Sequence, residues 1–142
     1  MSAPEPRASV STRGPALIVG TGLLGTSLAL ALRAAGVEVL LSDTSPTSLA
    51  LARDMGAGSL HDEDSPEPQI VVVATPPDVT AEVVVAQLSA HPSAVVTDVA
   101  SVKERVVAEV RARAGDEARR YVGSHPMAGR ERSGAGAADC DL

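Results

Sequence analysis

The feature that most constrains the fold is the stretch Ala16 to Gly25, in which a short apolar run breaks into the pattern Gly20-x-Gly22-x-x-Gly25. Each glycine has its own use in a nucleotide-binding turn. The first lets the chain turn sharply, the second lets a pyrophosphate approach bare backbone, and the third lets the next helix pack closely on a strand. The free N–H groups at the positive end of that helix then bind the diphosphate. We therefore expect a strand–turn–helix unit that binds a dinucleotide.

The segments on either side of the glycines favour this interpretation over an ordinary glycine turn. The apolar run before them predicts a strand over residues 15–20, and the leucines after them predict a helix over residues 23–35. Leu24, Leu28 and Leu32 share one stripe of that helix. A strand that feeds a helix through this turn is the context in which the glycine pattern becomes specific.

An acidic residue follows the next strand. Val37 to Leu41 predict that strand, and Asp43 lies 18 positions after Gly25, near the usual spacing of about 20. We expect the Asp43 carboxylate to accept hydrogen bonds from both ribose hydroxyls of the adenosine half and to repel a 2′-phosphate. Because no arginine follows within residues 44–46, the sequence favours NAD over NADP.

The rest of the chain alternates predicted helices and strands. We expect a helix from Pro46 to Met55, a short strand at Ser59 and Leu60, and a strand over Ile70 to Ala74. A helix capped by Asp78 then runs to Ala90, and a strand follows over Ala94 to Thr97. The next helix ends near Gly115 and has Val102, Val106 and Val110 as its buried stripe, and the last strand covers Arg120 to Val122. This alternation predicts an α/β fold with a doubly wound, mostly parallel sheet. We place a disordered tail in residues 1–14 and one dinucleotide-binding domain in residues 15–142.

Composition excludes several classes of protein. Tyr121 is the single aromatic residue and the net charge is −6, so nucleic-acid binding is not expected. The single cysteine, Cys140, permits no internal disulfide and fits a reducing compartment. No apolar run approaches the about 20 residues of a membrane span, and the N-terminus lacks a signal-peptide pattern. We expect a cytoplasmic protein without membrane contact, and we assign no metal ligands.

Ligands of doubly wound sheets bind at the carboxyl ends of the strands, where the chemically active residues of this sequence gather. The expected cofactor-binding residues are Gly20, Thr21, Gly22, Leu23, Leu24, Gly25, Asp43, Thr75, Pro76 and Asp98, and Ser101, Ser124 and His125 follow later strands. For Asp98 two roles stay open: it orients backbone or ribose at the crevice, or it satisfies the turn that follows it. We expect these strand ends to converge on one crevice.

Four motifs lie at these strand ends. They are Gly20-Thr-Gly-Leu-Leu-Gly25, Ala74-Thr-Pro-Pro77, Thr97-Asp-Val-Ala-Ser-Val-Lys103 and Gly123-Ser-His-Pro-Met-Ala-Gly129-Arg-Glu-x-Ser-Gly134. Together they resemble the prephenate/arogenate dehydrogenases of tyrosine biosynthesis, over about residues 15–142. The first motif is common to NAD(P) enzymes, whereas the last two are specific to the family. The resemblance implies the Rossmann fold and the NAD-dependent oxidative decarboxylation of prephenate to 4-hydroxyphenylpyruvate, or of arogenate to tyrosine.

The resemblance places the family's catalytic histidine on His125 and its substrate-hydroxyl serine on Ser101, and we count Ser124 with them as substrate-binding. A neutral imidazole that titrates near neutral pH accepts the hydroxyl proton as hydride leaves the carbinol carbon. On the residues alone, a loop histidine that caps backbone is an equal alternative. Ser101 is also suited to cap a helix, because Glu104 follows three positions later.

The surroundings of four further side chains indicate their roles. His61 stands in a polar loop and His91 beside a proline at a helix end, so we expect both on the surface. Lys103, the only lysine, faces either an anionic ligand or solvent. We expect no nucleophilic role for Cys140, whose acidic neighbours Asp139 and Asp141 raise the pKa of its thiol.

The family continues beyond the position of Leu142 through another strand and an all-helical domain that supplies the dimer interface and an arginine for a substrate carboxylate. We therefore expect a truncated form of the sheet, incomplete at the C-terminus, that is monomeric, binds NAD weakly and turns over poorly, whereas the full-length family form is a homodimer. One alternative is a non-catalytic NAD-binding module that senses cofactor or joins a partner chain. A third is a β-hydroxyacid or imine reductase, although these lack the His-Pro-Met-Ala-Gly loop.

Overall fold

A single parallel sheet organises the computed structural model, which describes residues 14–101 and 103–123. The elements are β1 (Ala16–Val19), α1 (Leu23–Ala34), β2 (Val39–Ser42), α2 (Pro46–Asp54), β3 (Ser59–Leu60), β4 (Ile70–Val73), α3 (Pro77–Ala90), β5 (Val95–Asp98), α4 (Lys103–Ala114), the 3-10 helix η1 (Gly115–Arg120) and β6 (Tyr121–Gly123). The strand order is β3-β2-β1-β4-β5-β6, and all neighbours pair in parallel. This is the order of the doubly wound Rossmann sheet, so the predicted fold class is confirmed.

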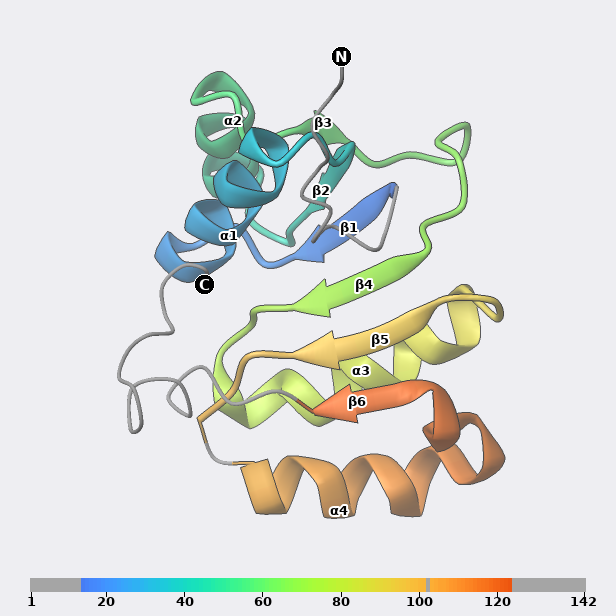
Figure 1. Cartoon of the computed structure of the whole chain (residues 1–142). Coiled ribbons are helices and arrows are strands. Elements are labelled where there is room, and N and C mark those ends of the chain that lie inside the picture. The colour runs from blue at the N-terminus through green and yellow to red at the C-terminus, as the bar shows by residue number, and fades with distance from the viewer. Residues whose placement is uncertain (1–13, 102, 124–142) are drawn as a thin grey trace.

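Helices cover the sheet from both sides (Figure 1). On one face, Ala29 of α1 and Ala52 of α2 pack with the apolar side chains of β1, β2 and β4. On the other face, Val84 of α3 and Val110 of α4 pack with β1, β4 and β5. Because every strand runs in the same direction, the loops after β1, β2, β4 and β5 meet at one edge of the sheet.

Helix α1 lies close to the sheet because its contact side is made of small residues. Gly25, Thr26 and Ala29 are its buried residues. The leucines of the predicted stripe lie beside this contact side: Leu28 and Leu32 are partly buried and pack against the same core, whereas Leu24 is 49% exposed. The helix ends as predicted, with Gly36 at φ +88°, a left-handed conformation that glycine adopts without strain.

Two predictions about α3 are wrong. The helix begins at Pro77, and its N-cap Pro76 makes no side-chain cap hydrogen bond, so Asp78 lies inside the first turn and does not cap it. A proline suits this first position because its missing N–H would have no partner there. His91, expected on the surface, is 7% exposed. Its ring packs edge-on against His61, and its Nδ1 lies 2.9 Å from Glu67 Oε1.

The C-terminal end of α3 is held by a distant arginine. The Arg120 guanidinium donates hydrogen bonds of 2.7–2.9 Å to the carbonyl oxygens of Leu88, His91 and Ala94. The Leu88 carbonyl is one that a helix end leaves without an internal partner, because Pro92 has no N–H, and the other two bonds connect Arg120 to the segment between α3 and β5. Arg120 closes η1, a 3-10 helix that local sequence patterns did not predict.

Several predictions lie outside the described residues, among them the tail over residues 1–13 and the position of Val102 in the buried stripe of α4. Val106 and Val110 of that stripe are buried as predicted. Across the described ranges, every helix is too short or too polar to pass through a membrane. The same ranges contain no group of three His, Cys, Asp or Glu residues placed to hold a metal ion.

Candidate functional site

A cavity of about 1120 Å³ opens at the carboxyl edge of the sheet. Its walls come from the segments that follow β1, β2, β4 and β5, and from one side of α3: Gly20, Gly22, Leu23 and Leu24, then Asp43 and Thr44, then residues 74–77, then residues 99–101. The structure therefore brings together four of the five strand ends that the sequence analysis selected. The fifth, with Ser124 and His125, lies outside the described residues.

The glycine turn has the geometry of an anion cradle. Gly20 has φ +108°, and a Cβ on it would lie 2.4 Å from the Ala74 carbonyl oxygen, so only glycine fits. A Cβ on Gly22 would meet nothing within 4 Å, which leaves open space over the bare backbone. Gly22 is also the N-cap of α1 and provides no side-chain cap, and the first turn contains no acidic residue. The first N–H groups of α1 thus suit a pyrophosphate.

Asp43 joins the glycine turn to the end of β2. Its Oδ2 accepts hydrogen bonds from the Thr21 backbone N–H at 2.6 Å and the Thr21 hydroxyl at 2.8 Å, and its Oδ1 accepts the Ser45 N–H at 2.8 Å. Burial acts to raise the pKa of Asp43, but the hydrogen bonds from Thr21, Ser45 and Thr44 outweigh it and leave the pKa below its ordinary value. The carboxylate in the cavity wall is therefore ionised at neutral pH.

Two predicted cofactor residues lie beneath the cavity surface. Thr21 is 5% exposed, and its carbonyl accepts a hydrogen bond from the Thr26 hydroxyl at 3.0 Å. Gly25 is buried, and a Cβ there would lie 1.9 Å from the Gly20 carbonyl oxygen. Both residues shape the turn that carries Gly22.

The segment after β4 contributes Thr75 and Pro76 to the wall. The Thr80 hydroxyl donates to the Pro76 carbonyl at 3.0 Å and lies 3.2 Å from the Thr75 hydroxyl. Thr80 is fully buried at the start of α3, so these contacts hold the segment in place from inside the fold.

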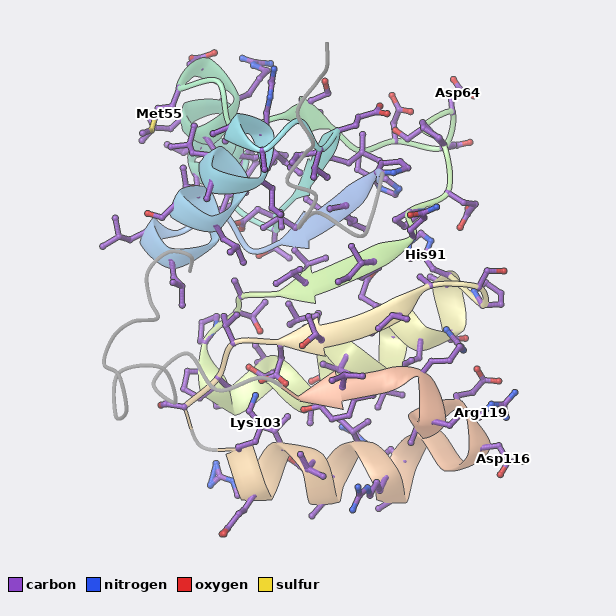
Figure 2. The ribbon with its side chains drawn as sticks, in the orientation of Figure 1. Met55, Asp64, His91, Lys103, Asp116 and Arg119 are labelled. Carbon is purple, nitrogen blue, oxygen red and sulfur yellow. The ribbon has the colours of Figure 1, made fainter. Side chains whose placement is uncertain are left out.

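Asp98 is fully buried, and its bond to the Ala100 N–H both satisfies the turn that follows and orients backbone in the cavity wall, whereas a contact with ribose stays a prediction. Its Oδ2 accepts the Ala100 N–H at 2.9 Å and lies 2.5 Å from Lys103 Nζ, and its Oδ1 accepts the Tyr121 hydroxyl at 2.5 Å. The solvent-facing alternative for Lys103 is wrong, because its side chain is 10% exposed and is paired with Asp98, whereas contact with an anionic ligand stays a prediction. Figure 2 shows Lys103 at the start of α4, near the end of β6.

Ser101 is exposed and lines the cavity, as expected of a residue that meets ligand. Position 102, between Ser101 and α4, lies outside the described residues, so the capping role of Ser101 stays a prediction. The same holds for the roles of Ser124, His125 and Cys140.

Sequence reasoning missed one wall of the cavity. Val79, Glu82, Val83, Ala86 and Gln87 line it from one side of α3. Gln87 Oε1 is buried and has no hydrogen-bond partner among the described residues. The sequence did contain a sign of this wall, because α3 carries valines and alanines outside the stripe that packs on the sheet.

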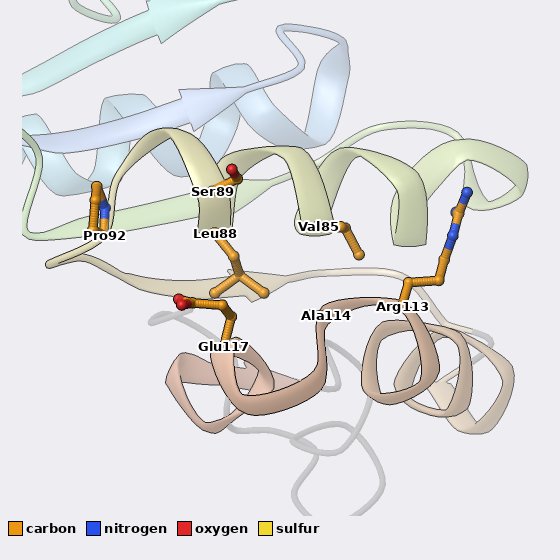
Figure 3. A pocket seen from close by; sticks show the side chains of 7 residues that line it. All are labelled: Val85, Leu88, Ser89, Pro92, Arg113, Ala114 and Glu117. Atoms are coloured by element: carbon orange, nitrogen blue, oxygen red, sulfur yellow. The ribbon is translucent and has the colours of Figure 1, made fainter.

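A second, smaller hollow of about 330 Å³ lies between α3 and the junction of α4 with η1 (Figure 3). Val85, Leu88 and Ala114 give it an apolar floor, and Arg113 and Glu117 stand at its sides. It is next to the end of α3, which precedes β5, and so it lies toward the amino edge of the sheet, opposite the larger cavity.

Comparison with known proteins agrees with this architecture. The family described as prephenate dehydrogenase, nucleotide-binding domain, matches residues 28–142. The match begins inside α1, after the glycine turn, so it does not depend on the motif that many nucleotide-binding proteins share.

Individual relatives give the same picture. The Streptomyces niveus protein named probable prephenate dehydrogenase NovF is 44% identical over 128 residues, which are 89% of this chain and 34% of that protein. Prephenate dehydrogenase of Lactococcus lactis is 31% identical over 132 residues, 89% of this chain and 37% of that protein. The crystal structure of Synechocystis arogenate dehydrogenase aligns with a TM-score of 0.65 at 25% identity, over 79% of this chain and 40% of that chain. The chain thus spans about a third of the length of the curated relatives it matches.

Proposed function

The chain belongs to the prephenate dehydrogenase family, whose nucleotide-binding domain it matches, and from this premise we propose that it binds NAD in the cavity at the carboxyl edge of its sheet. The observation that supports the proposal most is the shape of the glycine turn. The backbone at Gly22 is open to a ligand, and at Gly20, where the chain turns, no side chain fits. We further propose residues 15–142 as one dinucleotide-binding domain.

The cavity offers a partner for each part of the cofactor. The first N–H groups of α1, after Gly22, suit the pyrophosphate, and the ionised Asp43 suits the adenosine ribose hydroxyls. The apolar surface of Pro76 and Val79 suits the adenine ring, and the turn at Ala100 and Ser101 forms the opposite end of the wall. When bound there, a nicotinamide supplies the acceptor for a hydride.

For the reaction, we propose oxidation and decarboxylation of prephenate or arogenate, with His125 as the base that takes the substrate hydroxyl proton. Ser101 and Ser124 bind the substrate near that hydroxyl. The exposed position of Ser101 in the cavity wall supports its part of this assignment. The names of the relatives support the substrate class.

Cofactor binding is tested by calorimetric titration of the 142-residue chain with NAD and NADP, repeated on Asp43→Asn. We expect tighter binding of NAD than of NADP, and a loss of about tenfold or more in NAD affinity on Asp43→Asn, because a hydrogen bond to a charged group contributes about 1.5–3 kcal/mol. Asp116→Asn is the control, since Asp116 is exposed on η1. Equal affinities for the two cofactors, or no loss on Asp43→Asn, would remove Asp43 from its role.

The catalytic assignment has its own test, the formation of NADH from NAD with prephenate or arogenate. His125→Asn should lower the rate by a factor of about 10²–10⁴, the usual contribution of a general base. His61→Asn, at a ring that packs against His91 and does not line the cavity, should leave it unchanged. If the parent chain binds NAD and forms no NADH with either substrate, the binding proposal stands and the catalytic one is withdrawn.

A further inference from the structure

A buried cluster, formed by Asp98, Lys103 and Tyr121, lies beneath the turn at Ala100 and Ser101. We call it the Asp98 cluster. The Asp98 side chain has no exposed surface and that of Lys103 is 10% exposed. Tyr121 is half-buried on β6. A charge in such surroundings persists only when it is paired and hydrogen-bonded.

The contacts of Asp98 connect three separate segments. Its Oδ2 binds Lys103 at the start of α4 and the Ala100 N–H in the cavity wall, and its Oδ1 binds Tyr121 on β6. The Lys103 ammonium also lies 3.5 Å from the Asp98 carbonyl oxygen. One carboxylate therefore determines where the turn after β5 lies relative to α4 and β6.

Gly123 fits into the same cluster. It pairs with Asp98 in the register of β5 and β6. A Cβ on Gly123 would lie 2.9 Å from Lys103 Cδ and 3.1 Å from the Tyr121 hydroxyl. The side chains of the cluster thus cross the strand where it has no side chain of its own, and Ser124 and His125 follow directly in the sequence.

We propose that Asp98, Lys103 and Tyr121 are positioning residues for the cofactor cavity, which hold the Ala100–Ser101 turn in its wall and join that turn to the end of β6. They act through the turn and touch no ligand themselves, since none of the three lines the cavity. The inference rests on the proposed function, because the turn is taken as part of a cofactor site. On this proposal, the affinity of the site for its cofactor depends on the Tyr121 hydroxyl and the Lys103 ammonium group, which lie outside the cavity walls.

Tyr121 makes the cluster accessible to spectroscopy, because it is the only aromatic residue of the chain. Tyrosine labelled with ¹³C at Cζ gives a single resonance. Burial and the hydrogen bond to Asp98 raise the pKa of Tyr121, and Arg111 on α4 acts in the opposite direction. Loss of the Asp98 contact is therefore visible as a change in this resonance and a lower pKa of the hydroxyl.

The experiment compares Tyr121→Phe and Lys103→Met with Arg105→Met, which removes an exposed charge from the same turn of α4. NAD affinity is measured at a temperature where far-UV circular dichroism shows each variant folded. We expect both cluster variants to lose about tenfold in affinity and the control less than twofold. The double variant Asp98→Asn/Lys103→Met should regain part of the loss, because it leaves no unpaired buried charge.

Two results would overturn the proposal. The first is a parent chain that binds NAD together with folded cluster variants that bind it equally well. The second result concerns a parent chain that binds neither NAD nor NADP, which means that the proposed function fails. The positioning role of the cluster is then tested by NMR alone. Displaced amide resonances of Ala100 and Ser101 in Tyr121→Phe would then support it, and unchanged ones would overturn it.

Discussion

The two halves of the sheet build their parts of the cavity from different materials. In the half formed by β1, β2 and β3 with α1 and α2, the glycine turn contributes bare backbone to the wall, and its shape depends on the missing side chains of Gly20 and Gly25. In the half formed by β4, β5 and β6 with α3 and α4, part of the wall is the turn at Ala100 and Ser101, beneath which lie the buried charges of Asp98 and Lys103.

The difference shows that one site can be disrupted in two ways, by an added side chain or by a lost charge. A backbone cradle fails when a single carbon is added, because the neighbouring backbone cannot move away. A turn held by an ion pair fails when one partner is removed, because the other is left buried without compensation. The predictions below separate these two kinds of failure.

The largest effect is expected in the backbone half. Gly25→Ala places a Cβ 1.9 Å from the Gly20 carbonyl oxygen, so α1 must move off the sheet. We expect the free energy of unfolding to fall by about 3 kcal/mol or more in urea titrations. Gly22→Ala, whose Cβ meets nothing within 4 Å, should lose no more than about 1 kcal/mol, the usual penalty for alanine at an N-cap. Equal losses for the two variants would contradict a cradle built by close packing.

The next effect belongs to the charged half. Lys103→Met removes the ammonium group that pairs with the buried Asp98 carboxylate, and we expect a loss of about 3 kcal/mol in the free energy of unfolding. Arg105→Met, in the same helical turn but exposed, should change it by less than about 0.5 kcal/mol. Thermal and urea unfolding of both variants check this. If Lys103→Met is as stable as Arg105→Met, the ion pair does not support this half.

A smaller effect is expected at the other edge of the charged half. Arg120→Met removes the hydrogen bonds to the carbonyl oxygens of Leu88, His91 and Ala94, with an expected loss of about 2 kcal/mol. The neighbouring Arg119 is exposed (Figure 2), and Arg119→Met serves as the matched control. Because these contacts lie far from the cavity, NAD affinity should not change. A stability loss equal to that of the control would show that water replaces the guanidinium without penalty.

The smallest effect concerns Asp43, the carboxylate that the backbone half contributes to the cavity wall. The pKa of Asp43 is lower in the folded chain than the about 3.9 of an unfolded one. Its stabilising contribution is therefore complete above that unfolded value and is lost as the pH falls through the folded pKa. Asp43→Asn should flatten the fall in stability between about pH 5 and pH 2, and Asp116→Asn should not. Unfolding midpoints measured across this range test it, and parallel profiles for the two variants would exclude Asp43 as a source of acid sensitivity.

Much of the fold could be predicted from local spacing. The glycine pattern, the β-branched run at residues 70–73 and the short strand at Ser59–Leu60 all occur where the sequence predicted them, within one or two residues. These features depend on backbone conformation and on uninterrupted apolar runs, which neighbouring residues determine. The same reasoning placed Asp43 in the cavity wall, because its distance from the glycines is set by the length of one helix and one strand.

By itself, the sequence determined the parallel sheet, the edge at which the cavity lies and the glycine turn, since each follows from turns, apolar runs and spacings within short stretches of chain. Only the tertiary structure decided which partner each charged side chain has. Lys103 pairs with Asp98, His91 is buried beside Glu67, and Arg120 binds a carbonyl at the end of a helix about 30 residues earlier. A charge takes the partner that the fold brings within about 3 Å, and no local pattern records that distance.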